Sequence, residues 1–239
     1  MPQQGPLRWL DGEGWLVLLG GGDWFRGETD QVDAQLLSVA NLDRPMVVLT
    51  AEGSQATADG ILEHYTALGG PGGESFSLGA MTRDQLQTQE FLQLLQEAGI
   101  LYLGGENPLP LANNLVNTEA LRYVVEGFST LQGLTLIGAD AGAAALGRWV
   151  FTPQPPYHQA MGLGFVLNAV VSPHFTGTEN SPVLRALPQI GENLLGLGIP
   201  DGVALALGPA GQVETWGEGR VTAVVSTRDI NDVEPDDVG

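Results

Sequence analysis

The chain of 239 residues has no cysteine, and all nine of its Lys+Arg residues are arginine. Without cysteine there can be no disulfide, no Cys-ligated zinc or iron–sulfur site and no cysteine nucleophile. Without lysine there can be no Schiff base and no P-loop lysine. Only three histidines, His64, His158 and His174, are available as an imidazole base.

Positive charge is scarce. The 28 acidic residues give a formal net charge of −19, which argues against nucleic acid and anionic membrane surfaces as partners and disfavours acidic peptides as substrates. No uncharged apolar run reaches the roughly 18 residues of a membrane helix. The first apolar run, Trp15–Leu19, has no basic region before it and no cleavage site after it. We therefore expect a cytoplasmic protein.

Short apolar runs alternate with helix-like patterns over the first 140 residues. This alternation predicts an α/β fold in three layers, a mostly parallel sheet with helices on both faces. Thr82 and Gln85 are spaced as a capping box. The predicted strands are Trp15–Leu19, Met46–Thr50, Ser75–Leu78, Ile100–Leu103 and Leu134–Ile137, and the predicted helices are Asp30–Ala40, Ala56–Leu68, Thr82–Ala98 and Thr118–Phe128.

The last third of the chain has a different pattern, with short strands between Gly and Pro turns. It predicts antiparallel strands toward the C-terminus, with one helix, Ser181–Leu195, among them. We expect one α/β domain over residues 1–228 and an acidic, frayed tail over 229–239. The predicted strands are Val166–Val171, Val203–Leu207, Val213–Trp216 and Val221–Val225.

The sequence Gly-Ala-Asp-Ala-Gly-Ala at 138–143 lies between a predicted buried strand and a predicted helix, Ala143–Leu146. This is the strand–turn–helix context of a nucleophile elbow. Small residues suit it because side chains two before and two after the strained central residue would clash. Asp140 takes the central position. The simpler alternative is that Asp140 only caps the helix, because Asp is among the best N-caps.

Six segments in order resemble peptidase family S51, which contains cyanophycinase and dipeptidase E. The resemblance implies the three-layer architecture of the class I glutamine amidotransferase-like and flavodoxin-like folds. At the elbow the family has Gly-x-Ser-Ala-Gly-Ala, so Asp140 stands at its serine. The segments are Leu16–Gly22, Met46–Thr50, Leu103–Asn107 (LGGEN), residues 138–143 (GADAGA), Met161–Phe175 and Leu197–Leu205 (LGIPDGVAL).

The resemblance also implies roles for individual residues. Asp140 would stand at the nucleophile and His174 at the general base, while the backbone N–H groups of Gly105 and Ala141 would line the oxyanion hole. Neither a metal nor a cofactor is implied. The residues expected around the pocket are Gly21, Gly22, Glu106, Asn107, His158 and Gln159.

Two departures bear on activity. A carboxylate has no proton to give to a base and is a poor nucleophile toward amides, unlike serine. The resemblance places the triad acid between nucleophile and histidine, but residues 141–178 contain no Asp or Glu. We therefore expect an S51-like protein without peptidase activity, which keeps a pocket for a peptide or small molecule or acts as an assembly partner, for example as a homodimer.

Three alternatives remain open. Asp140 could itself be the nucleophile of a hydrolase, attacking an alkyl carbon or activated ester while His174 activates water. The chain could be an active cyanophycinase- or dipeptidase-like serine peptidase with another nucleophile, such as Ser172 or Ser181, although neither lies in an elbow. Asp140 and His174 could also hold a cation, but two ligands are few for a metal site.

Overall fold

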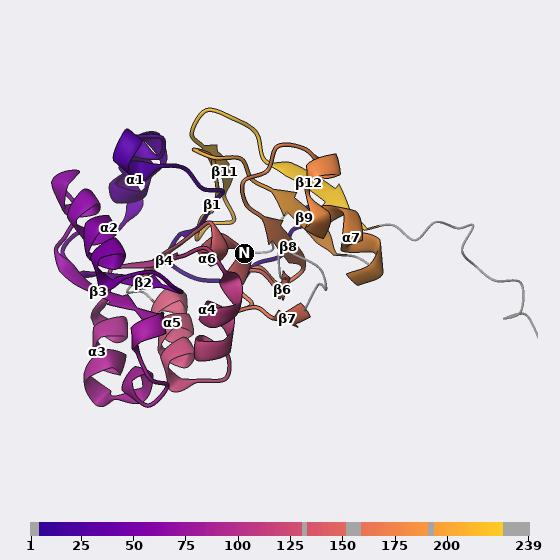
Figure 1. The fold of residues 1–239 in the computed structure, drawn as a ribbon. Coiled ribbons are helices and arrows are strands. Elements are labelled where there is room, and N and C mark those ends of the chain that lie inside the picture. Colours follow the sequence, from indigo (N-terminus) through magenta and orange to yellow (C-terminus); the bar gives the residue numbers. More distant parts are fainter. Residues whose placement is uncertain (1–4, 131–132, 152–158, 191–193, 227–239) are drawn as a thin grey trace, which may run out of the picture.

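The computed structural model describes residues 5–130, 133–151, 159–190 and 194–226. Its main sheet has seven strands in the order β11-β10-β1-β5-β4-β2-β3 (Figure 1). The five strands from β1 to β3 in this order are parallel, whereas β10 and β11 are antiparallel. The strands are β1 Leu16–Leu19, β2 Met46–Thr50, β3 Gly73–Ser77, β4 Ile100–Gly104, β5 Thr135–Ala139, β10 Ala204–Leu207 and β11 Val213–Trp216.

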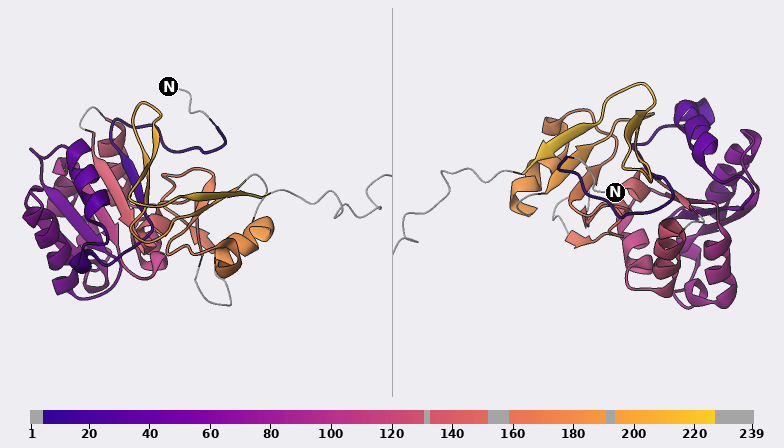
Figure 2. Two further views of the ribbon diagram at one scale, coloured as in Figure 1. Left: turned by 90° about the horizontal axis from the view of Figure 1, so that it is seen from above. Right: turned by 180° about the vertical axis from the view of Figure 1, so that it is seen from behind.

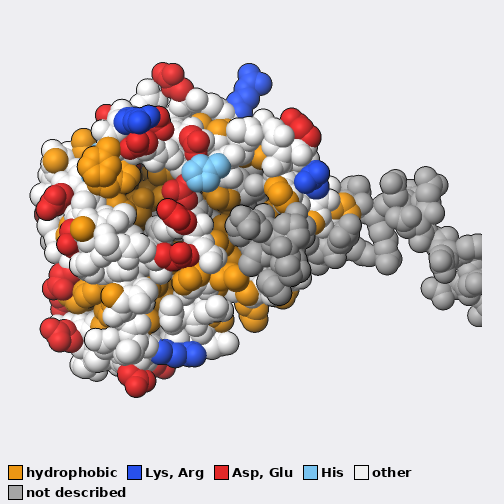
Figure 3. Space-filling view, viewed as in Figure 1, with side chains coloured by type: hydrophobic (Ala, Val, Ile, Leu, Met, Phe, Trp, Pro, Cys, Tyr) orange, Lys and Arg blue, Asp and Glu red, His pale blue; other side chains and the backbone are white. Residues whose placement is uncertain are grey.

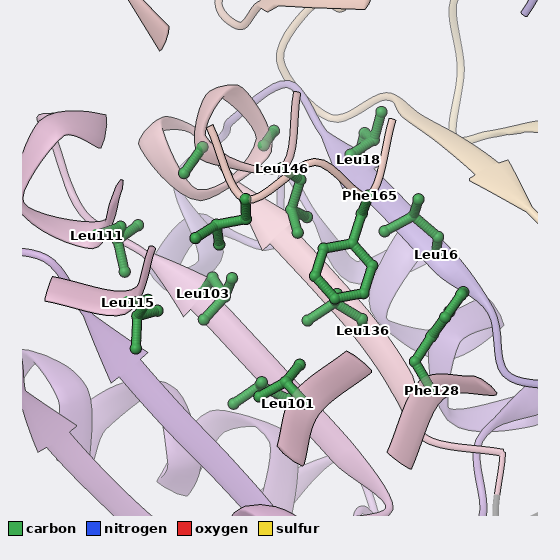
Figure 4. Close-up of a cluster of buried hydrophobic side chains, with 14 of the residues drawn as sticks. Leu16, Leu18, Leu101, Leu103, Leu111, Leu115, Phe128, Leu136, Leu146 and Phe165 are labelled. Atoms are coloured by element: carbon green, nitrogen blue, oxygen red, sulfur yellow. The ribbon is translucent and has the colours of Figure 1, made fainter. Parts of the chain in front are cut away.

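Helices cover both faces of this sheet. One face packs against α1 (Asp30–Val39) and α2 (Gln55–Ala67). The other packs against four helices, and Figure 4 shows the core between them and the strands. Because both faces are buried, the central strands are continuous apolar runs without a polar alternation. The four helices are α3 Gln89–Glu97, α4 Pro108–Leu115, α5 Glu119–Ser129 and α6 Ala141–Ala145.

A smaller sheet in the order β12-β9-β8 lies beside the main one, with α7 (Pro182–Ile190) packed on it (Figure 2). Its strands β8 and β9 are parallel, and β12 is antiparallel to β9. The strands are β8 Ala169–Ser172, β9 Leu195–Gly198 and β12 Thr222–Val225, and a separate hairpin pairs β6 Trp149–Phe151 with β7 Gln159–Met161. Short 3₁₀ helices in the described part of the chain are η1 Trp24–Arg26, η2 Leu78–Ala80, η3 Gln85–Gln87 and η4 Thr178–Asn180.

The predicted architecture is confirmed, but the helix predicted over Thr82–Ala98 is not continuous. The capping box forms, since Gln85 accepts the Thr82 N–H at 2.8 Å, yet it begins only η3. Thr88 then adopts an extended conformation and accepts the Phe91 N–H, which starts α3. A second good N-cap therefore divided the segment into two helices.

Two other predictions for the second half need correction. The helix predicted over Ser181–Leu195 is shorter, because α7 covers Pro182–Ile190 and Leu195 already belongs to β9. The final strands are also not all antiparallel neighbours, since β8 and β9 pair in parallel. The tail at 229–239 lies outside the described residues. None of the described helices is long and apolar enough to cross a membrane.

Candidate active site

Three consecutive backbone carbonyls at the end of β1 and in the loop after it anchor the site. Leu19 accepts the Asp140 N–H at 3.1 Å, Gly20 accepts the His174 N–H at 2.8 Å, and Gly21 accepts the Gly202 N–H at 2.8 Å. The loop after β1 thus ties together the segments that follow β5, β8 and β9. These segments gather at the carboxyl ends of parallel strands, where open α/β sheets bind ligands.

Asp140 has the backbone of a nucleophile elbow. Its φ of 52° and ψ of −115° place it outside the helical region, at the start of α6. A Cβ on Gly138 would lie 2.6 Å from the Gly142 carbonyl, and one on Gly142 would lie 1.9 Å from the Leu103 oxygen. The expected need for small residues on either side is confirmed. The Asp140 side chain makes no capping hydrogen bond, so the alternative of a simple N-cap is wrong.

The side chains of Asp140, His174 and Asp201 form a line. His174 Nε2 lies 2.8 Å from Asp140 Oδ1, and His174 Nδ1 lies 2.6 Å from Asp201 Oδ1. The contact with Asp140 is an ion pair by distance rather than an aligned hydrogen bond. Each imidazole nitrogen therefore faces a carboxylate, as in a catalytic triad whose nucleophile position holds an acid.

The expectation that His174 lacks an acidic partner is wrong. Asp201 follows β9, and His174 follows β8, the parallel neighbour of β9. The carboxyl ends of adjacent parallel strands meet at one edge, so Asp201 reaches His174 although it lies after the histidine in the chain. The acid was expected between the nucleophile and the histidine, but Asp201 lies beyond the histidine in the sequence. The signal was an Asp directly after the apolar segment 195–200.

His174 holds its proton strongly. Contact with Asp140, chiefly, and the hydrogen bond and charge of Asp201 raise its pKa from 6.5 to about 9, against partial desolvation. The side chain is 58% exposed, so solvent screens these charges in part. At neutral pH His174 is an imidazolium, which can give a proton but cannot accept one.

Gly21 makes room for this arrangement. Its φ is +129°, and a Cβ added to it would lie 2.4 Å from Asp140 Oδ1, 2.5 Å from His174 Cε1 and 2.6 Å from Asp201 Oδ1. All three site side chains thus converge on the space that a side chain at this position would occupy. The triple glycine after β1 is explained here by packing as well as by backbone freedom.

Two cavities meet at Asp140, and both include Gly105 and Glu106. The first, about 340 Å³, lies toward α1 and α2 and includes Gly21, Gly22 and several acidic side chains. The second, about 310 Å³, contains His174 and is largely apolar, with Trp149, Phe151, Val171, Pro173 and Phe175. Figure 3 shows acidic side chains gathered around a histidine on the hollowed face. The cleft is therefore open on both sides of the elbow.

Other predicted site residues lie differently. Ala141 donates its N–H to the Gly105 carbonyl at 3.3 Å, so an oxyanion could use it only after that peptide turned away. Asn107 caps α4 by accepting the Leu109 N–H, and exposed Gln159 lies on β7; neither lines the two cavities. His158 lies outside the described residues. His64 lines the first cavity and pairs with buried Asp33 at 2.8 Å.

The two serines considered as alternative nucleophiles contact each other. Ser172 and Ser181 are buried, and their hydroxyl oxygens lie 2.8 Å apart. Ser181 also accepts the Leu184 N–H at the start of α7. Both nitrogens of His174 already face carboxylates, so in this arrangement the imidazole activates neither hydroxyl.

Comparison with known proteins agrees with this geometry. A model of peptidase family S51 matches residues 16–210. A peptidase from an acI-B1 actinobacterium has a similar structure, with a TM-score of 0.69 at 20% identity over 92% of this chain and 97% of the other. A proposed peptidase E from Listeria monocytogenes EGD-e gives 0.57 at 15% identity over 90% and 99%. No curated protein matches the chain significantly.

Proposed function

The chain belongs to peptidase family S51, and from this premise we propose that it is a ligand-binding member of the family that does not hydrolyse peptides by serine chemistry. The observation that carries the proposal is the pair formed by Asp140 and His174. The elbow presents a carboxylate where acyl transfer needs a hydroxyl, and the neighbouring imidazole is already protonated at neutral pH. The open cavities on both sides support retained binding.

The electrostatics of the elbow point the same way. Acyl transfer develops negative charge on the carbonyl oxygen next to the nucleophile. A carboxylate at the elbow repels that charge, and the Ala141 N–H is engaged by Gly105. A carboxylate instead of a hydroxyl at position 140 therefore weakens both the attacking group and the stabilisation of the tetrahedral intermediate that attack would form.

A fluorophosphonate probe tests this proposal, because it labels only a serine activated by a working triad. We expect no labelling of the wild-type protein and labelling at position 140 in Asp140→Ser, which restores a hydroxyl beside the His174–Asp201 pair. The double variant Asp140→Ser/His174→Ala should again stay unlabelled. Specific labelling of one serine in the wild type, lost in His174→Ala, would refute the proposal.

A second candidate function is hydrolysis with Asp140 as nucleophile. It is favoured by the complete line from Asp140 through His174 to Asp201. An Asp140 oxygen would attack a carbon, the bond to the leaving group would break, and His174 would give that group its proton. The resulting ester removes the Asp140 carboxylate, whose contact with the imidazole chiefly raises the His174 pKa. The imidazole then becomes a base and takes a proton from the water that hydrolyses the ester.

Turnover in ¹⁸O-labelled water distinguishes this candidate. Attack of water on the acyl carbon of Asp140 places one labelled oxygen in its carboxylate, which peptide mass spectrometry detects. Substrates with an activated alkyl carbon suit this test, because a carboxylate attacks them more readily than amides and the only acyl carbon of the resulting ester is that of Asp140. A substrate that turns over without labelling Asp140 would exclude the nucleophile role.

A further inference from the structure

The second cavity, which contains His174, has an apolar wall drawn from separate parts of the chain. Trp149 and Phe151 come from β6, and Val171 comes from β8. Val183 lies in the first turn of α7 and completes this wall. Because each element contributes only one or two apolar side chains, the fold creates the wall and no single segment of the sequence reveals it.

Several apolar side chains of this wall are only half-buried. Trp149, Phe151 and Val183 pack against a small buried cluster, yet each keeps part of its surface open to water. Covering apolar surface is favourable, and apolar surface that lines a concave site is typical of ligand-binding grooves. An apolar occupant would therefore be stabilised by this wall. The buried cluster consists of Val170, Leu187 and Leu194.

The polar side chains of this cavity are already paired within the protein. The hydroxyl oxygens of Ser172 and Ser181 lie 2.8 Å apart, and the Asn180 side chain donates to the Thr176 hydroxyl at 3.2 Å. Among the described residues, the one lining side chain with a buried polar atom that makes no hydrogen bond is Asp140, and that atom faces the imidazole. Away from the elbow, the cavity therefore has little hydrogen bonding to give to a ligand.

Charge in this cavity is limited to the side of the elbow. Of the described residues that line it, only Glu106, Asp140 and His174 are ionisable. Glu106 and Asp140 also line the first cavity, so they stand where the two cavities meet. Arg148 lies over the Trp149 ring at 5.7 Å and does not line the cavity. Because a charged group buried without a partner costs free energy, the apolar wall favours an uncharged occupant.

We propose that the second cavity binds an uncharged apolar side group, alkyl or aryl, of a ligand whose polar part lies at Asp140 and His174. Its volume of about 310 Å³ is near the lower limit of small-molecule pockets, which suits one side group rather than a whole peptide. This inference rests on the proposed function, since it names the group that the same cleft recognises. The side chains that select this group are those of the apolar wall, chiefly Trp149, Phe151 and Val183.

Calorimetric titration with a series of matched probes tests the inference. The probes are the N-acetyl amides of alanine, norvaline and norleucine, which differ only in the length of the alkyl side group. We expect the affinity to rise about fourfold for each added methylene, the effect of burying one such group, and the heat capacity change of binding to become more negative along the series. N-acetyl-glutamine amide, which is similar in length to the norleucine probe but polar, should bind no more tightly than the alanine probe.

Two variants localise the effect. Val183→Thr should lower the affinity for the norleucine probe about fourfold, because it exchanges a methyl group of the wall for a hydroxyl of similar size. The matched control is Val224→Thr on β12, which packs against the same buried cluster but does not line the cavity, and it should bind like the wild type. Ala144→Leu on α6 fills part of the cavity and should abolish the gain from the longer alkyl groups, which keeps the test valid if Val183→Thr does not fold.

Equal affinity along the alkyl series, tighter binding of the glutamine probe than of the norleucine probe, or an equal loss in the Val224 variant would each overturn the inference. The readout is binding alone. Fluorophosphonate labelling of the wild type would therefore refute the proposed function and leave this result standing, whereas absent binding with an unlabelled wild type would refute only the inference.

Discussion

At the scale of single residues, Gly21 has the most specific role. The structure predicts that Gly21→Ala separates Asp140 and His174, because the new methyl group would lie within 2.6 Å of all three site side chains. The His174 pKa, measured by NMR titration of its ring protons, should fall from about 9 toward its ordinary value. Gly69→Ala is the control, because Gly69 also has a positive φ but open space around it. An unchanged His174 pKa in Gly21→Ala would contradict the packing described.

The protonation of His174 makes the stability of the protein depend on pH. A histidine whose folded pKa is raised stabilises the fold fully below its unfolded pKa, and the effect is lost as the pH rises through the folded pKa. The window here runs from 6.5 to about 9. We expect the free energy of unfolding in urea to fall across this window in the wild type and to change less in Asp140→Asn. A free energy of unfolding that rose with pH in the wild type would show that protonation of His174 does not stabilise the fold.

Two of the three site residues, Asp140 and His174, could be located from the sequence, whereas Asp201 could not. Asp140 and His174 follow strands whose apolar runs are evident, so each could be placed at the carboxyl end of a strand from the sequence. Asp201 follows β9, a four-residue strand with two glycines that was not predicted; only its first residue, Leu195, was assigned, as the end of the predicted helix. Without β9, no rule connects Asp201 to His174. The contact depends on the parallel pairing of β8 with β9.

At the scale of elements, the packing of α6 against β4 and β5 gives a contrast between two glycines. Gly142→Ala in α6 should destabilise the protein by about 2–4 kcal/mol, because its Cβ would meet the Leu103 carbonyl at 1.9 Å and the backbone would have to move. Gly127→Ala in α5 should instead stabilise it by roughly 0.5–1 kcal/mol, since its nearest neighbour is 3.6 Å away and alanine is the better helix former. Urea unfolding measures both. We expect the free energy of unfolding to fall in Gly142→Ala and to rise in Gly127→Ala. An equal fall in both variants would contradict the packing described.

Elements with strong periodicity or continuous apolar runs could be predicted from the sequence. Elements whose limits depend on a choice between two local signals, such as two possible N-caps, could not. Strand β2 was predicted with its observed bounds, because five apolar or β-branched residues leave little choice. Helix α4 was missed because Pro108 and Pro110 suggest a loop, although Pro108 stands at the first helical position, where proline is favourable. The break before α3 follows from two rival N-caps, Thr82 and Thr88, which sequence alone does not rank.

At the scale of the whole molecule, the charge of −19 predicts a stability that depends on salt. Self-repulsion opposes the compact state, and screening relieves it. We expect the midpoint of thermal unfolding to rise steeply with NaCl at low concentration and to level off near physiological ionic strength, where the Debye length has fallen to about 8 Å. A midpoint that rose steadily to molar salt would instead indicate a general solvent effect. Sedimentation velocity at the same NaCl concentrations tests the predicted homodimer, because it distinguishes the mass of a monomer from that of a dimer.

The loop after β1 also has a consequence for the order in which the protein matures during synthesis. The carbonyls of Leu19 and Gly20 leave the ribosome early, but their partners at 140 and 174 follow much later, and β1 pairs with β10 only once residues 204–207 exist. At about 5–20 residues per second, roughly 10 to 40 seconds separate the two strands of that pair. A nascent chain therefore exposes the edge of β1 for most of translation. The line from Asp140 through His174 to Asp201 can form only after residue 201 has been synthesised, so the assembled site marks a nascent chain that has passed this residue.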